Sequence, residues 1–130
     1  MKYVRALAIP IGILCSFILS YASLCAATEI LAKTKIPYSI LFPAFPYANN
    51  FVTTAIAAYI VGCIKKLLSY GDCVIVGICT LCLQVIGFIL LSCPPMLDGG
   101  QMLIDMVITI PGALFGGLVF RHTYRASKAD

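Results

Sequence analysis

Four stretches of this chain are apolar over nearly the length of a membrane-crossing helix, and they constrain its fold more than any other feature. They are residues 4–27, 49–64, 73–93 and 102–120. About 20 residues of α-helix, rising 1.5 Å each, are needed to cross roughly 30 Å of hydrocarbon. The second stretch is short by itself, but it continues an apolar approach that begins near Ile36. The pattern predicts an all-α fold, an integral membrane bundle of four transmembrane helices.

Composition excludes the other broad classes of protein. The chain is 62% hydrophobic and 11% charged, whereas soluble chains are roughly half apolar and about a quarter charged. A disordered chain needs the opposite balance, with low hydrophobicity and high net charge. No polar stretch reaches the length of about 40 residues below which a separate soluble domain rarely folds alone. We therefore expect residues 1–130 to form a single polytopic membrane domain.

The first apolar stretch also has the basic start of a signal peptide, in Lys2 and Arg5. Its apolar core is about 21 residues long, however, and the core of a signal peptide is only about 7 to 15 residues long. We expect a span that the protein retains.

The positions of the cations predict the orientation of the four helices. Short loops rich in Lys and Arg stay on the cytoplasmic side of a membrane. With both termini in the cytoplasm, Lys33 and Lys35 lie outside, and the other seven of the nine cations lie inside: Lys2, Arg5, Lys65, Lys66, Arg121, Arg125 and Lys128. This distribution of cations predicts N-in/C-in topology. The net charge of +4 is explained by the topology, so no nucleic-acid partner is expected. This bias is typical of a bacterial inner membrane, which is the cell membrane that we expect to hold the chain.

The outer segment of residues 36–48 is apolar and aromatic, yet it contains Pro37, Pro43 and Pro46, which interrupt a continuous helix. Backbone that is not helical cannot lie exposed in hydrocarbon. We expect an aromatic anchor at the membrane interface, and the alternative is a re-entrant lid over an outward-facing cavity.

Three polar residues at membrane depth are the candidates for chemistry. Asp105 lies about one turn inside the fourth stretch, and a carboxylate costs roughly 2.5 to 3.5 kcal/mol at the centre of a membrane. Its side chain reaches the headgroups, serves a transport pathway, or pairs with Lys33 or Lys35. Gln84, near mid-membrane, needs a partner across a helix interface, or else it lines a polar path. Thr109 is the third candidate.

Small residues form a stripe along the fourth stretch. Gly112 and Gly116 make a G-x-x-x-G motif, and Ala113 and Gly117 repeat the spacing. Such a stripe lets a second helix approach closely. The partner is either another helix of the same chain or the same helix of a second copy, and the sequence leaves both open.

The seven cysteines predict neither a metal site nor redox catalysis. Cys25 and Cys93 fall at the expected outer ends of two spans, where an oxidising compartment would allow a disulfide. The others are expected to pack as small apolar residues. With one histidine, His122, the chain has no set of zinc ligands, and no cofactor is expected.

A turn before the fourth stretch, PPMLDGG, resembles the PP-x-LDGG segment of site-2-type intramembrane metalloproteases, in which the Asp binds zinc. Those proteases also need an H-E-x-x-H helix for the other ligands and the general base. This sequence has no such helix, so the protease activity is excluded.

Three functions remain open. The first is a structural or accessory subunit that packs through its fourth span. The second is an oligomeric small transporter or channel that uses Asp105 and Gln84. The third is a membrane-embedded enzyme acting on a lipid-linked substrate, and it has the least support because no nucleophile with an adjacent base is visible. The expected partners are the lipid bilayer and either further copies of the chain or a larger membrane complex.

Overall fold

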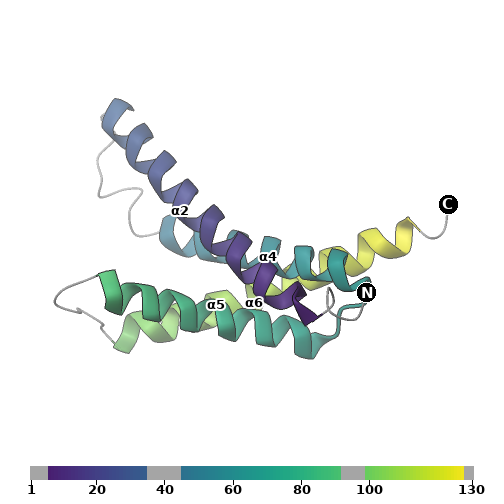
Figure 1. Ribbon diagram of the computed structural model, residues 1–130. Coiled ribbons are helices and arrows are strands. Elements are labelled where there is room, and N and C mark those ends of the chain that lie inside the picture. Colours follow the sequence, from purple (N-terminus) through teal and green to yellow (C-terminus); the bar gives the residue numbers. More distant parts are fainter. Residues whose placement is uncertain (1–5, 35–44, 92–98, 128–130) are drawn as a thin grey trace.

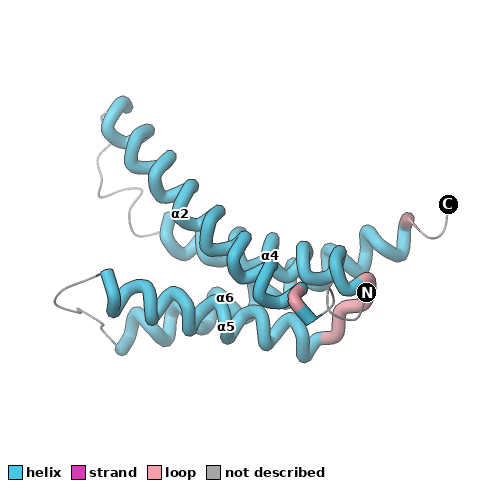
Figure 2. Tube along the Cα trace, viewed as in Figure 1, coloured by secondary structure: helices cyan, strands magenta, loops and turns pink. Residues whose placement is uncertain are grey.

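The computed structural model describes residues 6–34, 45–91 and 99–127 of the 130-residue chain. These residues form four helices and no strand (Figures 1 and 2). The helices are α2 (Ala8–Thr34), α4 (Phe45–Lys65), α5 (Tyr70–Leu91) and α6 (Gly99–Ala126). The all-α prediction is confirmed for this part of the chain. Two stretches, Ala8–Thr34 and Tyr47–Lys65, are long and apolar enough to cross a membrane.

Several helices extend beyond the apolar stretches. α2 continues to Thr34, and α6 runs past the fourth apolar stretch, through Arg121 to Ala126. α4 begins at Phe45, so residues 45–48 are helical and the expected outer segment is shorter than predicted. Pro46 fits because the first N–H groups of a helix have no acceptor within it. Residues 35–44 lie outside the described ranges, so the anchor and the lid both stay predictions.

α4 occupies the centre of the arrangement. It packs most extensively on α6 and also packs on α2, while α5 lies mainly against α6. Figure 1 shows α2 diverging from the other helices toward its C-terminal end. The end of α4, the start of α5 and the last turns of α6 meet at one end of the bundle, which we call the inner end (Figure 1).

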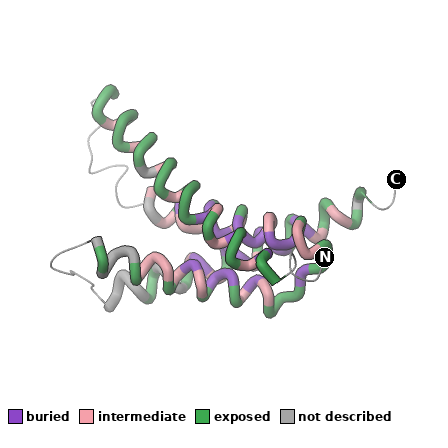
Figure 3. Tube along the Cα trace, viewed as in Figure 1, coloured by how far each residue is buried: buried purple, intermediate pink, exposed green. Residues whose placement is uncertain are grey.

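Most buried positions carry small or hydroxyl side chains, and many large apolar side chains are exposed. Figure 3 shows where the buried and exposed positions lie along the chain. Leu14, Ile18 and Val107 are between 58% and 70% exposed. Soluble proteins show the reverse distribution, because Ile, Leu, Val and Phe are among the residues most often buried. Among the described residues, the buried ones are Ala8, Gly12, Ser16, Asn49, Thr53, Thr54, Ala57, Ala58, Val61, Gly62, Leu68, Cys73, Val76, Gly77, Thr80, Thr109, Gly112, Ala113, Gly116, Gly117 and Phe120.

α2 contacts α4 through small residues spaced four apart. Ala8 and Ser16 are buried on this face, and Gly12 lies between them. A Cβ atom on Gly12 would lie 2.9 Å from the backbone oxygen of Ala57 in α4. A larger residue at position 12 would therefore separate the two helices.

Gly112 and Gly116 of α6 face α4. A Cβ atom on Gly112 would lie 2.8 Å from the backbone oxygen of Phe51, and one on Gly116 would overlap the backbone of Ala55. The G-x-x-x-G motif thus packs on a helix of the same chain, which is one of the two partners that the sequence leaves open.

Ala113 and Gly117 line the neighbouring face of α6, toward α5. A Cβ atom on Gly117 would overlap the sulfur of Cys73, and one on Gly77 of α5 would lie 3.5 Å from the Cβ of Ala113. The stripe on α6 therefore divides between two helices, with one face for α4 and the other for α5.

Phe120 joins α4 and α6 near the inner end. Its ring covers Gly62 so closely that a Cβ atom there would lie 2.6 Å from the ring. It forms an edge-to-face pair with the Tyr59 ring, with centroids 5.9 Å apart, and it stacks on the Tyr124 ring at 5.4 Å. Such aromatic pairs stabilise a fold by about 0.5 to 1.5 kcal/mol beyond the area that they bury.

Candidate functional site

Two neighbouring asparagines on α4 connect three helices through hydrogen bonds. Asn49 binds α2: its Oδ1 accepts from the Ser23 hydroxyl at 2.6 Å, and its Nδ2 donates to the Ser20 hydroxyl at 3.1 Å. Asn50 binds α5, because its Oδ1 accepts from Nε2 of Gln84 at 3.0 Å. These five residues form what we call the interhelical network.

The backbone carbonyl groups of the two asparagines also accept hydrogen bonds. The hydroxyls of Thr53 and Thr54 donate to the carbonyl oxygens of Asn49 and Asn50 at 2.8 and 2.6 Å. Among the residues that the structure describes, no buried side-chain nitrogen or oxygen lacks a hydrogen-bond partner. A polar path for a solute needs polar atoms that face open space, whereas these bind one another.

The structure describes the side chains of some predicted site residues and not of others. Gln84 is half-buried in the interhelical network, and Thr109 is fully buried on α6. Asp105 belongs to α6, but its side chain is outside the described part, so its role stays a prediction. Cys25 is exposed on α2 and Cys93 lies outside the described ranges, so the predicted bridge is untested.

The second group of polar contacts surrounds the connection between α4 and α5 at the inner end. α4 ends where Lys66 adopts a left-handed conformation with φ of 57°. The N–H of Lys66 donates to the carbonyl oxygen of Gly62 at 2.8 Å. This is the αL type of helix end, in which the residue after the helix satisfies one of its last carbonyl groups.

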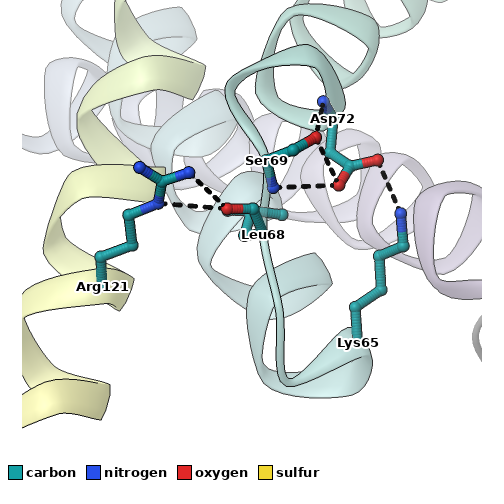
Figure 4. Close-up of polar contacts among 5 residues, drawn as sticks. All are labelled: Lys65, Leu68, Ser69, Asp72 and Arg121. Atoms are coloured by element: carbon teal, nitrogen blue, oxygen red, sulfur yellow. Dashed lines mark hydrogen bonds and ion pairs between the residues drawn. The ribbon is translucent and has the colours of Figure 1, made fainter.

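α5 begins with a capping box (Figure 4). The N–H of Asp72 donates to the Ser69 hydroxyl at 3.1 Å, and the N–H of Ser69 donates to Oδ2 of Asp72, also at 3.1 Å. Two N–H groups that lack acceptors within the helix are thus satisfied by the two side chains. The Lys65 ammonium group at the end of α4 donates to Oδ1 of Asp72 at 2.6 Å and ties the two helix ends together.

The Asp72 carboxyl has a lowered pKa. Burial, the largest influence, raises the pKa, but the hydrogen bonds from Lys65 and Ser69 together outweigh burial and hold the pKa below its ordinary value of 3.8. Asp72 is therefore ionised at neutral pH. It acts as a fixed negative charge, not as a proton donor.

Arg121 of α6 reaches across to the same connection (Figure 4). Its Nε and Nη2 donate to the carbonyl oxygen of Leu68 at 3.1 and 2.6 Å. The guanidinium also lies over the Tyr70 ring, 4.1 Å from the ring centroid. Leu68 and Cys73 also pack on Gly117. The connection between α4 and α5 is therefore held to α6 by both hydrogen bonds and apolar contacts.

Within the described ranges, no three His, Cys, Asp or Glu side chains gather to hold a metal ion. The two groups of polar contacts, the interhelical network and the contacts around the connection between α4 and α5, join helices to one another.

Sequence reasoning missed several features, two of which have readable signals. The capping box is written as Ser-x-x-Asp at positions 69–72, and the α2 face as small residues at positions 8, 12, 16 and 20. Asn49 and Asn50 enter the sequence analysis only as the start of a span, although they bind two other helices. The contact of Arg121 with Leu68 has no local signal, because 53 positions separate the two residues.

No family model matches the chain, and neither a curated protein nor a solved structure matches it. Inferences about its function therefore rest on its own residues.

Proposed function

We propose that this chain is a small multi-pass membrane protein that acts as a structural or accessory subunit, with four spans and both termini in the cytoplasm. The distribution of side chains carries the proposal. Small and hydroxyl residues fill the interior, and large apolar ones cover the outside. Helices pack this way in lipid, where close approach and hydrogen bonds between helices replace the hydrophobic effect.

In water the same surface would be costly. An exposed Leu, Ile, Val or Phe forgoes roughly 1.5 to 3 kcal/mol relative to a buried one, and more than twenty large apolar side chains are exposed here. In hydrocarbon those side chains carry no penalty. The bilayer is therefore the partner that the chain's outer surface fits.

The charges support the orientation. Lys65, Lys66, Arg121 and Arg125 all lie near the inner end, where α4 ends and α6 ends. Lys33 lies in the last turn of α2, at the other end of that helix from the inner end (Figure 1). Cations on the cytoplasmic side are the rule for short loops, so we assign the inner end to the cytoplasm.

The contacts of the polar residues favour a subunit over a transporter. The transporter alternative requires Gln84 to face a water path, but its amide nitrogen donates to Asn50. α2 is attached along one face only, and much of its remaining surface is exposed. That surface is available to lipid and to other membrane helices.

Reporter fusions test the membrane topology. A reporter fused after Asp130 should be active only in the cytoplasm, and one fused after Thr34 only on the external side. Alkaline carbonate should leave the chain in the membrane pellet. Recovery of the chain in the aqueous fraction without detergent would overturn the proposal.

Crosslinking in native membranes tests the subunit role. We expect a reproducible adduct heavier than the monomer, identified by mass spectrometry. A chain that stays at its monomer mass, combined with proton or cation flux in proteoliposomes that Asp105→Asn abolishes, would replace the subunit with the transporter.

A further inference from the structure

A hollow of about 560 Å³ opens at the inner end, between the start of α5 and the last turns of α6. Leu118, Arg121, His122 and Arg125 line it from α6, and Tyr70 lines it from α5. The α6 residues share one face because their positions follow the i, i+3, i+4, i+7 spacing of a helix face. Two arginines and a histidine thus surround one space, and none of its lining residues is acidic.

Arg121 is held in place before any ligand arrives. Leu68 O accepts two of its hydrogen bonds, and the Tyr70 ring lies beneath its guanidinium. A guanidinium has five N–H groups, so three remain after the two bonds to Leu68. Figure 4 shows one guanidinium nitrogen pointing away from Leu68, with no dashed line. Because the side chain is already ordered, binding an anion costs little conformational entropy.

The positive charge of the hollow is not neutralised by the described part of the protein. Within the described ranges, the ion pair between Lys65 and Asp72 is the only salt bridge. Arg121 and Arg125 therefore have no described carboxylate at ion-pair distance. Planar guanidinium groups bind phosphate oxygens through paired hydrogen bonds.

The hollow is also partly apolar. Tyr70 is 57% exposed and Leu118 is 51% exposed. Further along the same helix Phe115, one turn from Leu118, presents an exposed ring. A ligand that fills this space needs an anionic group next to an apolar body, and a free inorganic anion has no apolar body.

We propose that the hollow binds the phosphate group of an anionic phospholipid from the cytoplasmic leaflet. This inference rests on the membrane orientation proposed above. The phosphate oxygens accept hydrogen bonds from Arg121 and Arg125, and the glycerol and first acyl carbons contact Tyr70 and Leu118. Basic hollows of this kind at the cytoplasmic ends of membrane helices bind acidic headgroups, and the volume lies within the range of small-ligand sites.

Binding is tested on the full chain in a mild non-ionic detergent by isothermal titration calorimetry. Dihexanoyl phosphatidylglycerol should bind saturably, whereas dihexanoyl phosphatidylcholine and inorganic phosphate should bind at least tenfold more weakly. Arg125→Gln should weaken phosphatidylglycerol binding about fivefold, which corresponds to about 1 kcal/mol for one cation near an anionic lipid.

Lys66→Gln is the matched control, since it removes the same charge at the same end of the bundle from a residue outside the hollow. It should change the affinity less than twofold. Both side chains are exposed, so both variants should fold, which circular dichroism checks.

Equal binding of the two lipids would overturn the proposal, and so would an equal loss in the two variants, which would indicate diffuse surface charge. Displacement of phosphatidylglycerol by inorganic phosphate at similar concentration would assign the hollow to a soluble anion instead. Any of these results, with the chain still in the carbonate-washed pellet, leaves the membrane proposal standing. Recovery of the chain in the aqueous fraction would remove both proposals.

Discussion

Adding one methyl group at Gly116 should force α4 and α6 apart. A Cβ atom at this position would lie 2.8 Å from Cα of Ala55 and 2.7 Å from its carbonyl carbon, with the carbonyl oxygen closer still. Carbon atoms pack best at about 3.5 to 4.0 Å. The two helices must therefore separate locally by at least about 0.7 Å, and the obstacle is backbone that cannot rotate away.

The expected cost follows from two opposing terms. A gap of about 0.5 to 1 Å forfeits a quarter to a half of each van der Waals contact, and overpacking of this kind typically costs about 1 to 3 kcal/mol. Replacing Gly by Ala inside a helix returns about 1 kcal/mol. Because rigid backbone places the first term near the top of its range, we expect Gly116→Ala to lower the free energy of unfolding by about 1 to 2 kcal/mol.

The measurement is unfolding by added dodecyl sulfate in mixed micelles, followed by helical circular dichroism. Gly71→Ala is the matched control: Gly71 is exposed on α5, and its added Cβ would meet only the Ser69 hydroxyl at 3.7 Å. It should be neutral or slightly stabilising. If Gly116→Ala were as stable as Gly71→Ala, the reasoning would be refuted. A loss that depended on protein concentration would indicate that the stripe joins two copies.

Three further predictions concern the polar contacts. Asn50→Leu and Gln84→Leu should show a coupling energy of about 0.6 kcal/mol, and at most about 1.7, in a double-mutant cycle; zero coupling would contradict the hydrogen bond. Because the pKa of Asp72 is lowered on folding, its contribution to stability is complete above pH 3.8 and is lost as the pH falls through the folded value. An acid-induced loss of stability should therefore be smaller in Asp72→Asn, and an identical pH profile would count against the capping box. Lys66→Gly should stabilise the protein by up to about 1 kcal/mol, because glycine avoids the cost of the left-handed conformation, whereas Lys66→Ala should not; denaturation in mixed micelles compares the two.

The sequence was sufficient to predict the helices but not their ends. The length of an apolar stretch can be read directly from the sequence, so it predicts which part of the chain is helical. The ends depend on particular side chains. Pro46 looked like a barrier to a helix, but it occupies the first turn, where no hydrogen bond is lost. Arg121 follows the last apolar stretch and has no local signal of a tertiary contact, yet its bonds to Leu68 join α6 to the connection between α4 and α5.

The candidate site was harder to predict because it depends on which helix faces meet. The stripe of small residues on α6 signalled close packing, but spacing alone cannot say that Gly116 faces α4 while Gly117 faces α5. The need of Gln84 for a partner was readable from its depth. That the partner is Asn50, 34 positions away, depends on the three-dimensional arrangement.

Because α4 packs on both α2 and α6, the order in which the helices are synthesised should determine which of its contacts form first. In the membrane topology proposed above, α2 leaves the ribosome first, and as the more apolar of the two candidate spans it should enter the bilayer without a companion. When α4 emerges, the two serines that bind Asn49 should then already lie in the membrane. α5 then brings Gln84 to Asn50. α6 is synthesised last, with the glycines that pack against α4 and α5. A permuted chain with α4 ahead of α2 should therefore insert less efficiently at the translocon, even though its final contacts would be the same.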